Sequence, residues 1–274
     1  MKKDKLTDIS MQIFCLLCAF MILIPIFYAV SVSFMRPEDI LTTSYNILPP
    51  EPSLENYVRA VTATPIMRYM FNSFWIALVC SVSRVIIGAC AAFAFSFYDF
   101  KGKKFLFLLT LTTIMIPPDV LVVQNYVTIS KMHLLNTYLG VCSIFLVSAN
   151  NIFMMRQHFL TFSRSLYEAA KLDGTSDLMF FVRVLLPTST PILFTIFISS
   201  FVNVWNQYVW PMLVASKTEM RTIQVGITML KDRESSAFGP VMAGTVLALI
   251  PTVIIFVVFL KKIVSGMMTG AVKE

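Results

Sequence analysis

Charged residues are scarce in this sequence: only 14% of its 274 residues are Asp, Glu, Lys or Arg, whereas 57% are hydrophobic. The mean hydropathy of +0.76 makes the chain far more apolar than an average soluble domain. The composition therefore excludes an ordinary soluble protein and favours an integral membrane protein.

Motifs for enzymatic chemistry are also missing. The chain contains no G-x-x-x-x-G-K-[ST] phosphate-binding loop for ATP, no H-E-x-x-H and no nucleophile elbow. Its two histidines, His133 and His158, are better explained as surface or interfacial residues than as catalysts. The Cys15-x-x-Cys18 pair lacks further ligands nearby and is interpreted as two small hydrophobic side chains. We therefore expect no catalytic residue, no metal site and no cofactor in this chain.

Long apolar stretches dominate what is present. A helix needs about 20 predominantly apolar residues to cross the hydrocarbon core of a bilayer, and six stretches meet that length. We expect an all-α integral membrane protein with six transmembrane helices, forming a single transmembrane domain over residues 1–274. The six stretches are Met11–Phe34, Phe71–Phe95, Phe105–Gln124, Tyr138–Met155, Thr190–Ala215 and Gly239–Leu260.

The net charge of +7 reflects membrane topology rather than nucleic-acid binding. With the N-terminus inside, the internal segments hold more Lys and Arg than the external ones, including Lys101, Lys103 and Lys104 after the second span. Because this bias sets the orientation of short loops, we expect both termini in the cytoplasm. The expected surroundings are a lipid bilayer, and no nucleic-acid partner is expected.

The longest internal loop, residues 156–189, lies between spans four and five. Ser165–Leu172 is predicted to form a short helix, and Gly174 suits the left-handed position just past its end. Thr175 or Ser176 can cap a second helix. An apolar face on a loop in water needs a cover, so we expect one over this second helix. Its apolar residues are Leu178, Phe180, Phe181, Val184 and Leu185.

Three short motifs occur in this loop, directly before an apolar span. They are Glu168-Ala169-Ala170, Asp173-Gly174 and a closing Leu186-Pro187. Their combination resembles the EAA loop of the inner-membrane permeases of binding-protein-dependent ABC importers. The sequence departs from the family pattern at two positions, because Ser163 replaces a common proline and Tyr167 stands where an acidic residue is frequent.

The resemblance implies the type I permease fold of ABC importers and a set of partners. A separate ATPase dimer would bind ATP and Mg²⁺, and the short helices of the loop would dock into it. A second homologous permease and an extracellular or periplasmic solute-binding protein would complete an assembly in the bacterial cytoplasmic membrane. The implied ATPase-coupling residues are Glu168, Ala169, Ala170, Leu172, Asp173, Gly174 and Pro187.

Further stretches narrow the resemblance to the carbohydrate-import branch of this family. They include Met115–Pro118, Leu135–Gly140 and Trp205–Pro211. Together they are similar to stretches of the second, smaller permease of maltose-type and glycerol-3-phosphate-type importers. The resemblance implies a solute that is a sugar, an oligosaccharide or a sugar derivative.

Polar residues within the spans are candidates for the solute path. The run Trp205–Tyr208 combines an aromatic stacking face with hydrogen-bonding groups, which suits a polyol. Its aromatic members equally fit a belt near the outer membrane surface. Asn203 lies close to this run, and Asn150 and Asn151 form a second polar pair in the fourth span. The candidates for the solute path other than Arg84 are Asn150, Asn151, Asn203, Trp205, Asn206, Gln207 and Tyr208.

Arg84 lies near the middle of the second span, where a cation costs at least about 2.5–3.5 kcal/mol on insertion scales. Two interpretations stay open. The guanidinium either lines the passage and favours an anionic solute such as glycerol-3-phosphate, or it bonds backbone carbonyls or the partner permease. Asp119 is the only acid in the spans and lies nearer the outside.

Two function classes compete with an importer permease. A membrane enzyme acting on lipid or glycan intermediates would need a catalytic cluster at the interface, and none is visible. A stand-alone channel or secondary transporter would work without an ATPase and would show more internal symmetry. Co-purification with an ATPase separates the permease from both.

Overall fold

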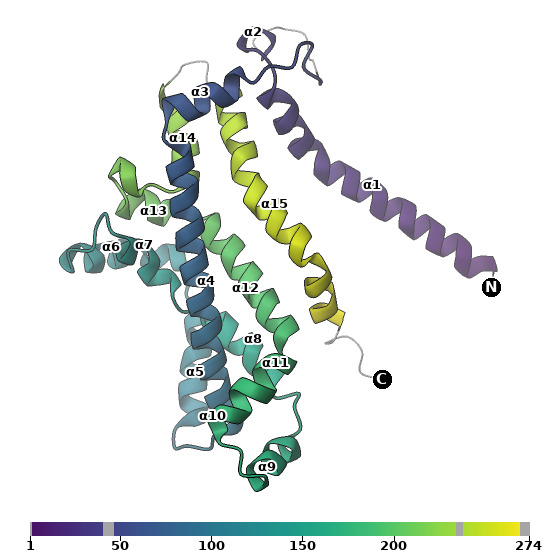
Figure 1. Cartoon of the computed structure of the whole chain (residues 1–274), viewed down its shortest axis with the longest axis vertical. Helices are drawn as coiled ribbons and strands as arrows, with labels where there is room; N and C mark the ends of the chain where they lie inside the picture. The colour runs from purple at the N-terminus through teal and green to yellow at the C-terminus, as the bar shows by residue number, and fades with distance from the viewer. Residues whose placement is uncertain (1, 41–46, 234–237, 269–274) are drawn as a thin grey trace. The chain divides into compact units, whose positions relative to one another are not determined.

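The computed structural model describes residues 2–40, 47–233 and 238–268. Over these residues the chain forms helices and loops without a β-strand, which confirms the all-α prediction (Figure 1). The predicted cytoplasmic position of the two chain ends concerns residues 1 and 269–274, which lie outside the described part.

The chain divides into two compact units. The first comprises Met1–Met67 and Gly226–Ile250, and the second comprises Arg68–Val225 and Pro251–Glu274. The predicted single domain over the whole chain stays a prediction. All candidate functional residues lie in the second unit.

Among the described residues, three uninterrupted helices are long and apolar enough to cross a membrane. They are α1 (Lys2–Ser33), α4 (Ile66–Phe97) and α15 (Phe238–Met268). They contain most of the first, the second and the sixth predicted span, respectively. Their length and composition agree with the prediction of membrane helices.

The third and fourth predicted spans are bent helix pairs, and the fifth begins with the second member of a further pair, whose first member belongs to the predicted loop. Each pair is apolar and long enough only when its two members are taken together, so the described part has three such helices, or up to six spans if each pair counts as one. The pairs are Lys103–Ile114 with Pro118–Lys131 at 90°, Tyr138–Phe145 with Ala149–Phe159 at 47°, and Asp177–Thr188 with Thr190–Trp205 at 77°.

The 90° bend lies at Pro117 and Pro118, two consecutive prolines within the third predicted span. Helix α5 (Lys103–Ile114) ends before Pro117, which is extended with φ −61° and ψ 128°. The chain then continues through η1 (Pro118–Leu121) into α6 (Val122–Lys131). A residue that precedes a proline is driven out of the helical region, so Pro118 enforces this end.

The prediction of one continuous span over Thr190–Ala215 is wrong. Helix α12 (Thr190–Trp205) ends at Asn206, and a separate helix α13 covers Val209–Val214. Pro211 explains the break, because proline cannot donate to the carbonyl four residues earlier and its ring clashes with that carbonyl.

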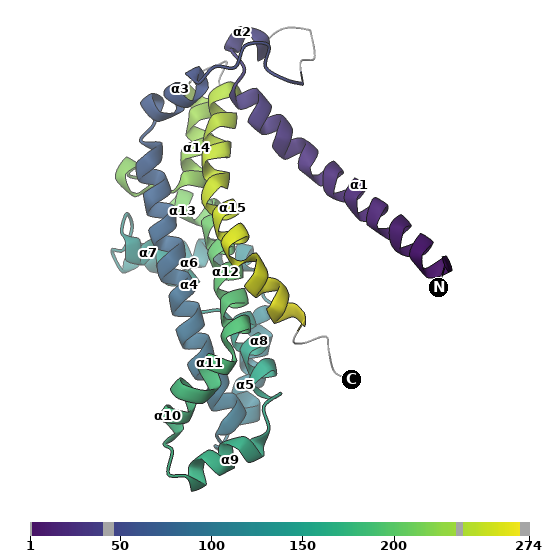
Figure 2. The ribbon, with the colours of Figure 1, turned by 45° about the vertical axis from the view of Figure 1, so that its right-hand side comes forward.

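Helix α9 (Arg164–Leu172) lies in both views at one end of the second unit, next to α10 (Asp177–Phe180) and the lower end of α4 (Figures 1 and 2).

Short helices complete the described chain. Their bounds are α2 (Pro37–Ile40), α3 (Glu55–Ala63), α7 (Tyr138–Cys142), η2 (Ser143–Phe145), α8 (Ala149–Phe159), α9 (Arg164–Leu172), α10 (Asp177–Phe180), η3 (Phe181–Leu185), α11 (Leu186–Thr188), η4 (Thr218–Met220) and α14 (Ile223–Arg233).

Candidate functional site

The turn after α9 is the first element of the candidate site. Gly174 has φ +79°, which confirms its predicted left-handed conformation. The Thr175 amide donates to the Ala170 carbonyl at 2.9 Å, and the Gly174 amide donates to the Lys171 carbonyl at 3.0 Å. These two bonds form a Schellman motif, which satisfies the last carbonyls of the helix and fixes the direction in which the chain leaves it.

The second helix of the loop begins at Asp177, and Ser176 is its cap. The Ser176 hydroxyl accepts a hydrogen bond from the Met179 amide at 3.2 Å. The helix then passes through a π-helical turn, η3, where the Leu186 amide donates to the carbonyl of Phe181. This turn was not predicted from the sequence, and π-turns insert one residue into a helix without interrupting it.

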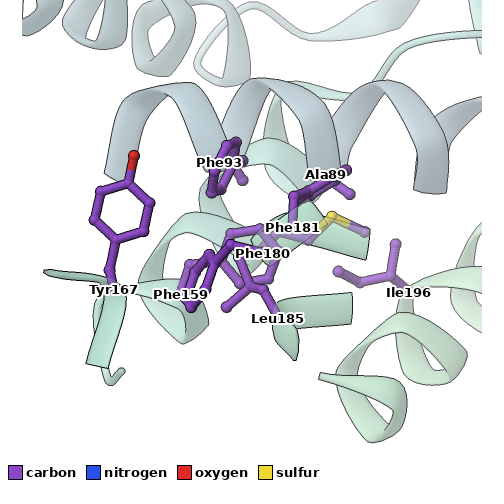
Figure 3. Close-up of a cluster of buried hydrophobic side chains, with 10 residues drawn as sticks. Ala89, Phe93, Phe159, Tyr167, Phe180, Phe181, Leu185 and Ile196 are labelled. Atoms are coloured by element: carbon purple, nitrogen blue, oxygen red, sulfur yellow. The ribbon is translucent and has the colours of Figure 1, made fainter. Parts of the chain in front are cut away.

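The apolar face of this second helix is covered by the chain itself. Phe180, Phe181 and Leu185 are buried against side chains of α4 and α8 (Figure 3). Leu178 departs from the prediction, since its side chain is 70% exposed. The covering residues are Ala89, Ala92, Phe93, Met155, Phe159, Tyr167 and Ile196.

Tyr167 joins the two helices of the loop. Its ring is buried, with its centroid 5.0 Å from those of both Phe97 and Phe180. Its hydroxyl donates to Asp177 Oδ1 at 2.6 Å, and Lys171 Nζ lies 3.2 Å from the same oxygen. Hydrogen bonds with Tyr167 and with Asp177 raise the pKa of Lys171. Tyr167, one of the two residues that depart from the family pattern, therefore makes the contact that holds α9 to α10.

Tyr167→Phe tests this contact, because it removes the hydroxyl and keeps the ring. A shielded hydrogen bond to a charged group contributes about 1.5–3 kcal/mol. Asp177 is partly exposed, so we expect a loss of about 1 kcal/mol, or roughly a fivefold larger population of the opened loop. Trypsin cleavage after Lys171 in the nanodisc-embedded chain should accelerate by that factor.

Tyr126→Phe is the matched control, since Tyr126 lies on α6, outside the loop. Its cleavage rate should equal that of the wild type. An unchanged rate in Tyr167→Phe would show that the Tyr167 hydroxyl does not hold the two helices together.

Arg164 anchors the start of α9 to the turn that follows α4. Its Nη2 lies 2.8 Å from Asp99 Oδ2, and its Nε lies 3.6 Å from Glu168 Oε1. The Arg164 guanidinium holds the pKa of Asp99 below its usual value. This contact is therefore complete above the ordinary aspartate pKa of about 3.9 and is lost as the pH falls through the lowered pKa. Near neutral pH it persists.

The predicted coupling residues lie on the outer side of this anchored loop. Glu168, Ala169, Asp173 and Gly174 are exposed, and Ala170 is half-buried. Pro187 is exposed at the far end of the second helix. Leu172 is 89% exposed, which is a large apolar surface for a residue in a helical loop. The loop thus has an exposed outer surface, while the side chains on its inner side are packed against α4 and α8.

The second element of the site is a polar cavity of about 480 Å³. Arg84 of α4, Asn150 of α8, Asn203 of α12 and Gln207 line it together, so the structure brings four predicted path residues to one place. Asp119 also lines this cavity.

The other four predicted path residues do not line this cavity. Asn151 is buried, and its amide donates to Ser200 Oγ at 2.8 Å. Trp205 is only 2% exposed and stacks on Phe201, so it forms neither a cavity wall nor a membrane belt. Asn206 accepts a hydrogen bond from Gln224 Nε2 at 3.2 Å, and Tyr208 lies outside the lining. Trp205 lies two residues after Asn203 on α12 and therefore faces nearly the opposite side of that helix, whereas Asn206 and Tyr208 follow its end.

Arg84 both bonds the protein and borders the cavity. Its Nε donates to the Phe145 carbonyl at 2.6 Å, and its Nη1 donates to Asn203 Oδ1 at 3.3 Å. No carboxylate of the described residues forms an ion pair with it, and Asp119 is no exception. A guanidinium has five N–H donors, of which these contacts use two. The remaining donors and the positive charge are available to a ligand.

Comparison with known proteins shows which family the chain matches. Residues 2–268 match the family described as the binding-protein-dependent transport system inner membrane component. The chain is 29% identical over 258 residues to the arabinooligosaccharides transport system permease protein AraQ of Halalkalibacterium halodurans, covering 93% of this chain and 92% of the relative.

Two further comparisons agree with this match. The sn-glycerol-3-phosphate transport system permease protein UgpE of Agrobacterium fabrum is 32% identical over 252 residues, which cover 89% of each chain. The fold is similar to a chain in the crystal structure of a bacterial ABC transporter involved in the import of the acidic polysaccharide alginate. Its TM-score is 0.84 at 23% identity, covering 95% of this chain and 98% of the other.

Proposed function

Because the chain belongs to the family of binding-protein-dependent transport system inner membrane components, we propose that it forms half of the passage for a sugar or sugar derivative. It is an ABC importer permease with an all-helical type I fold. A second, homologous permease supplies the other half of the passage. The observation that carries the proposal is the helical loop 164–188, whose outer surface is free and whose inner surface is fixed to the apolar helices.

The loop is proposed to be the docking element for an ATPase dimer that binds ATP and Mg²⁺. The Gly174 turn and the Tyr167 hydroxyl keep α9 and α10 in one arrangement. The buried Phe180 and Leu185 connect them to α4, α8 and α12. A force applied at Leu172 would then move these helices as one body, and alternating access works by such rigid-body motion.

Membrane orientation completes this proposal. The apolar helices and bent pairs support six spans, and the excess of Lys and Arg supports a cytoplasmic position of both termini and the loop. An extracellular or periplasmic solute-binding protein then delivers the solute to the opposite face. The ATPase dimer reaches only the cytoplasmic loop.

The polar cavity is proposed to be part of the solute path. The amides of Asn150, Asn203 and Gln207 provide donors and acceptors that suit sugar hydroxyls. The similarity to an arabinooligosaccharide permease supports a neutral oligosaccharide. A second candidate solute is an anionic polyol, which the unpaired charge of Arg84 and the similarity to a glycerol-3-phosphate permease favour.

Reconstitution tests the proposal. The chain, its partner permease and the ATPase are expected to purify as one assembly, and liposomes that contain it should accumulate solute only when ATP and the solute-binding protein are present. Equal uptake without the ATPase would indicate a stand-alone transporter. Turnover of a lipid or glycan intermediate by the chain alone would indicate a membrane enzyme.

A further inference from the structure

A second cavity, of about 510 Å³, lies where the turn after α4 meets the start of α5. Its two ends differ in chemistry. Lys103, Lys104 and Arg156 line one end together with Asp99. Phe107, Leu108 and Leu111 form an apolar wall along α5 at the other end.

The charged end of this cavity carries an excess of positive charge. Lys103 Nζ lies 3.5 Å from Asp99 Oδ1 and donates to the Tyr98 carbonyl at 2.6 Å. The other oxygen of Asp99 is taken by Arg164 at 2.8 Å. Within the described part of the chain, Lys104 and Arg156 form no ion pair. The single carboxylate of Asp99 therefore pairs with Lys103 and Arg164, and the charges of Lys104 and Arg156 are left without a carboxylate partner among the described residues.

Arg156 is held in place at the boundary between the two ends. Its guanidinium carbon lies 4.0 Å from the Phe107 ring centroid, and its Nε donates to the Phe95 carbonyl at 3.3 Å. Stacking on an aromatic ring leaves the edge N–H groups of a guanidinium available. Such a fork suits the oxygens of a phosphate.

We propose that this cavity binds an anionic phospholipid, with its phosphate between Lys103, Lys104 and Arg156 and an acyl chain along Phe107 and Leu108. Basic cavities between membrane helices on the cytoplasmic side suit anionic headgroups. The apolar wall favours a lipid over a free phosphate, since Leu108 is 60% exposed on an apolar helix. The proposal rests on the cytoplasmic orientation given above.

The position of this cavity links lipid binding to the docking loop. Asp99 is shared between Lys103 at the cavity and Arg164 at the start of α9. A phosphate that engages Lys103 leaves the Asp99 carboxylate to Arg164, which strengthens the anchor of α9. Anionic lipid should therefore raise the ratio of solute imported to ATP hydrolysed.

Lipid selectivity of the purified full chain tests the site without any transport assay. Spin-labelled phosphatidylglycerol should associate with the wild type about fivefold more strongly than spin-labelled phosphatidylcholine. The preference should fall below about twofold in Lys104→Gln and in the double variant with Arg156→Gln. Lys101→Gln is the matched control, because Lys101 lies on the same turn outside the cavity lining, and it should keep the preference.

Two results would overturn the lipid site. One is equal association of both lipids with the wild type, or an unchanged preference in both cavity variants. The other is displacement of the labelled phosphatidylglycerol by millimolar inorganic phosphate, which would identify a site for a free anion. A chain that keeps this selectivity but supports no ATP-driven uptake would contradict the proposed function and leave the lipid site standing.

Discussion

Gly174→Val is expected to lower ATP-driven uptake at least tenfold, while the chain still inserts into the membrane. The added Cβ meets no atom within 4 Å, so the effect arises from the backbone alone. At φ +79° an L-residue costs about 1–2 kcal/mol, and a β-branched side chain is among the least tolerated. Relaxing that strain breaks the Schellman motif and turns α9 away from the direction in which it docks.

The measurement is the rate of solute uptake per ATP hydrolysed in proteoliposomes. Gly174→Asn should recover most of it, because asparagine tolerates the left-handed region. Gly174→Asn is therefore the matched control, since it adds a side chain at the same open position without the full cost of the left-handed conformation. Normal uptake in Gly174→Val, or an equal loss in Gly174→Asn, would count against a docking role of the Gly174 turn.

Arg84→Gln is expected to lower uptake of a phosphorylated polyol at least tenfold and uptake of a neutral oligosaccharide less than about threefold. A hydrogen bond to a charged group contributes about 1.5–3 kcal/mol, which corresponds to roughly 10- to 100-fold. Glutamine keeps an N–H donor for the Phe145 carbonyl. We therefore expect the substitution to weaken binding of the phosphorylated solute more than it destabilises the local structure.

Competition between the two solutes in one proteoliposome preparation gives the ratio of their uptake rates directly. Arg84→Lys is the matched control, because it keeps the charge but loses the planar fork, and it should retain part of the preference for the phosphorylated solute. Equal losses for both solutes in Arg84→Gln would assign Arg84 a purely structural role at Phe145 and Asn203. The neutral sugar would then be the better candidate.

Local features that depend on short stretches of sequence could be predicted. A glycine after Ser165–Leu172 indicated the left-handed end of that helix, and a serine before Asp177 indicated the next cap. The apolar residues Phe180, Phe181 and Leu185 indicated a buried face. These predictions were confirmed because capping and burial are governed by residues that are neighbours in the chain or share one helix face.

Features that depend on contacts between distant segments could not be predicted. Nothing in the sequence marks the bond from Tyr167 to Asp177, because it requires the turn that places the two helices side by side. The end of α12 at Trp205 was likewise not predicted, because hydropathy alone suggested one continuous span over Thr190–Ala215. Pro211 was the available signal for that break.

The π-turn at Phe181–Leu185 has a consequence for chain length. Ordinary helix geometry would rotate Leu185 away from Phe180 by more than a third of a turn, since successive residues advance by about 100°. The additional residue restores their alignment, so both side chains reach the same core. A homologue with one residue fewer in this segment must therefore present a different set of side chains to α4 and α8. The number of residues between Asp177 and Pro187 therefore determines which side chains of this segment face α4 and α8.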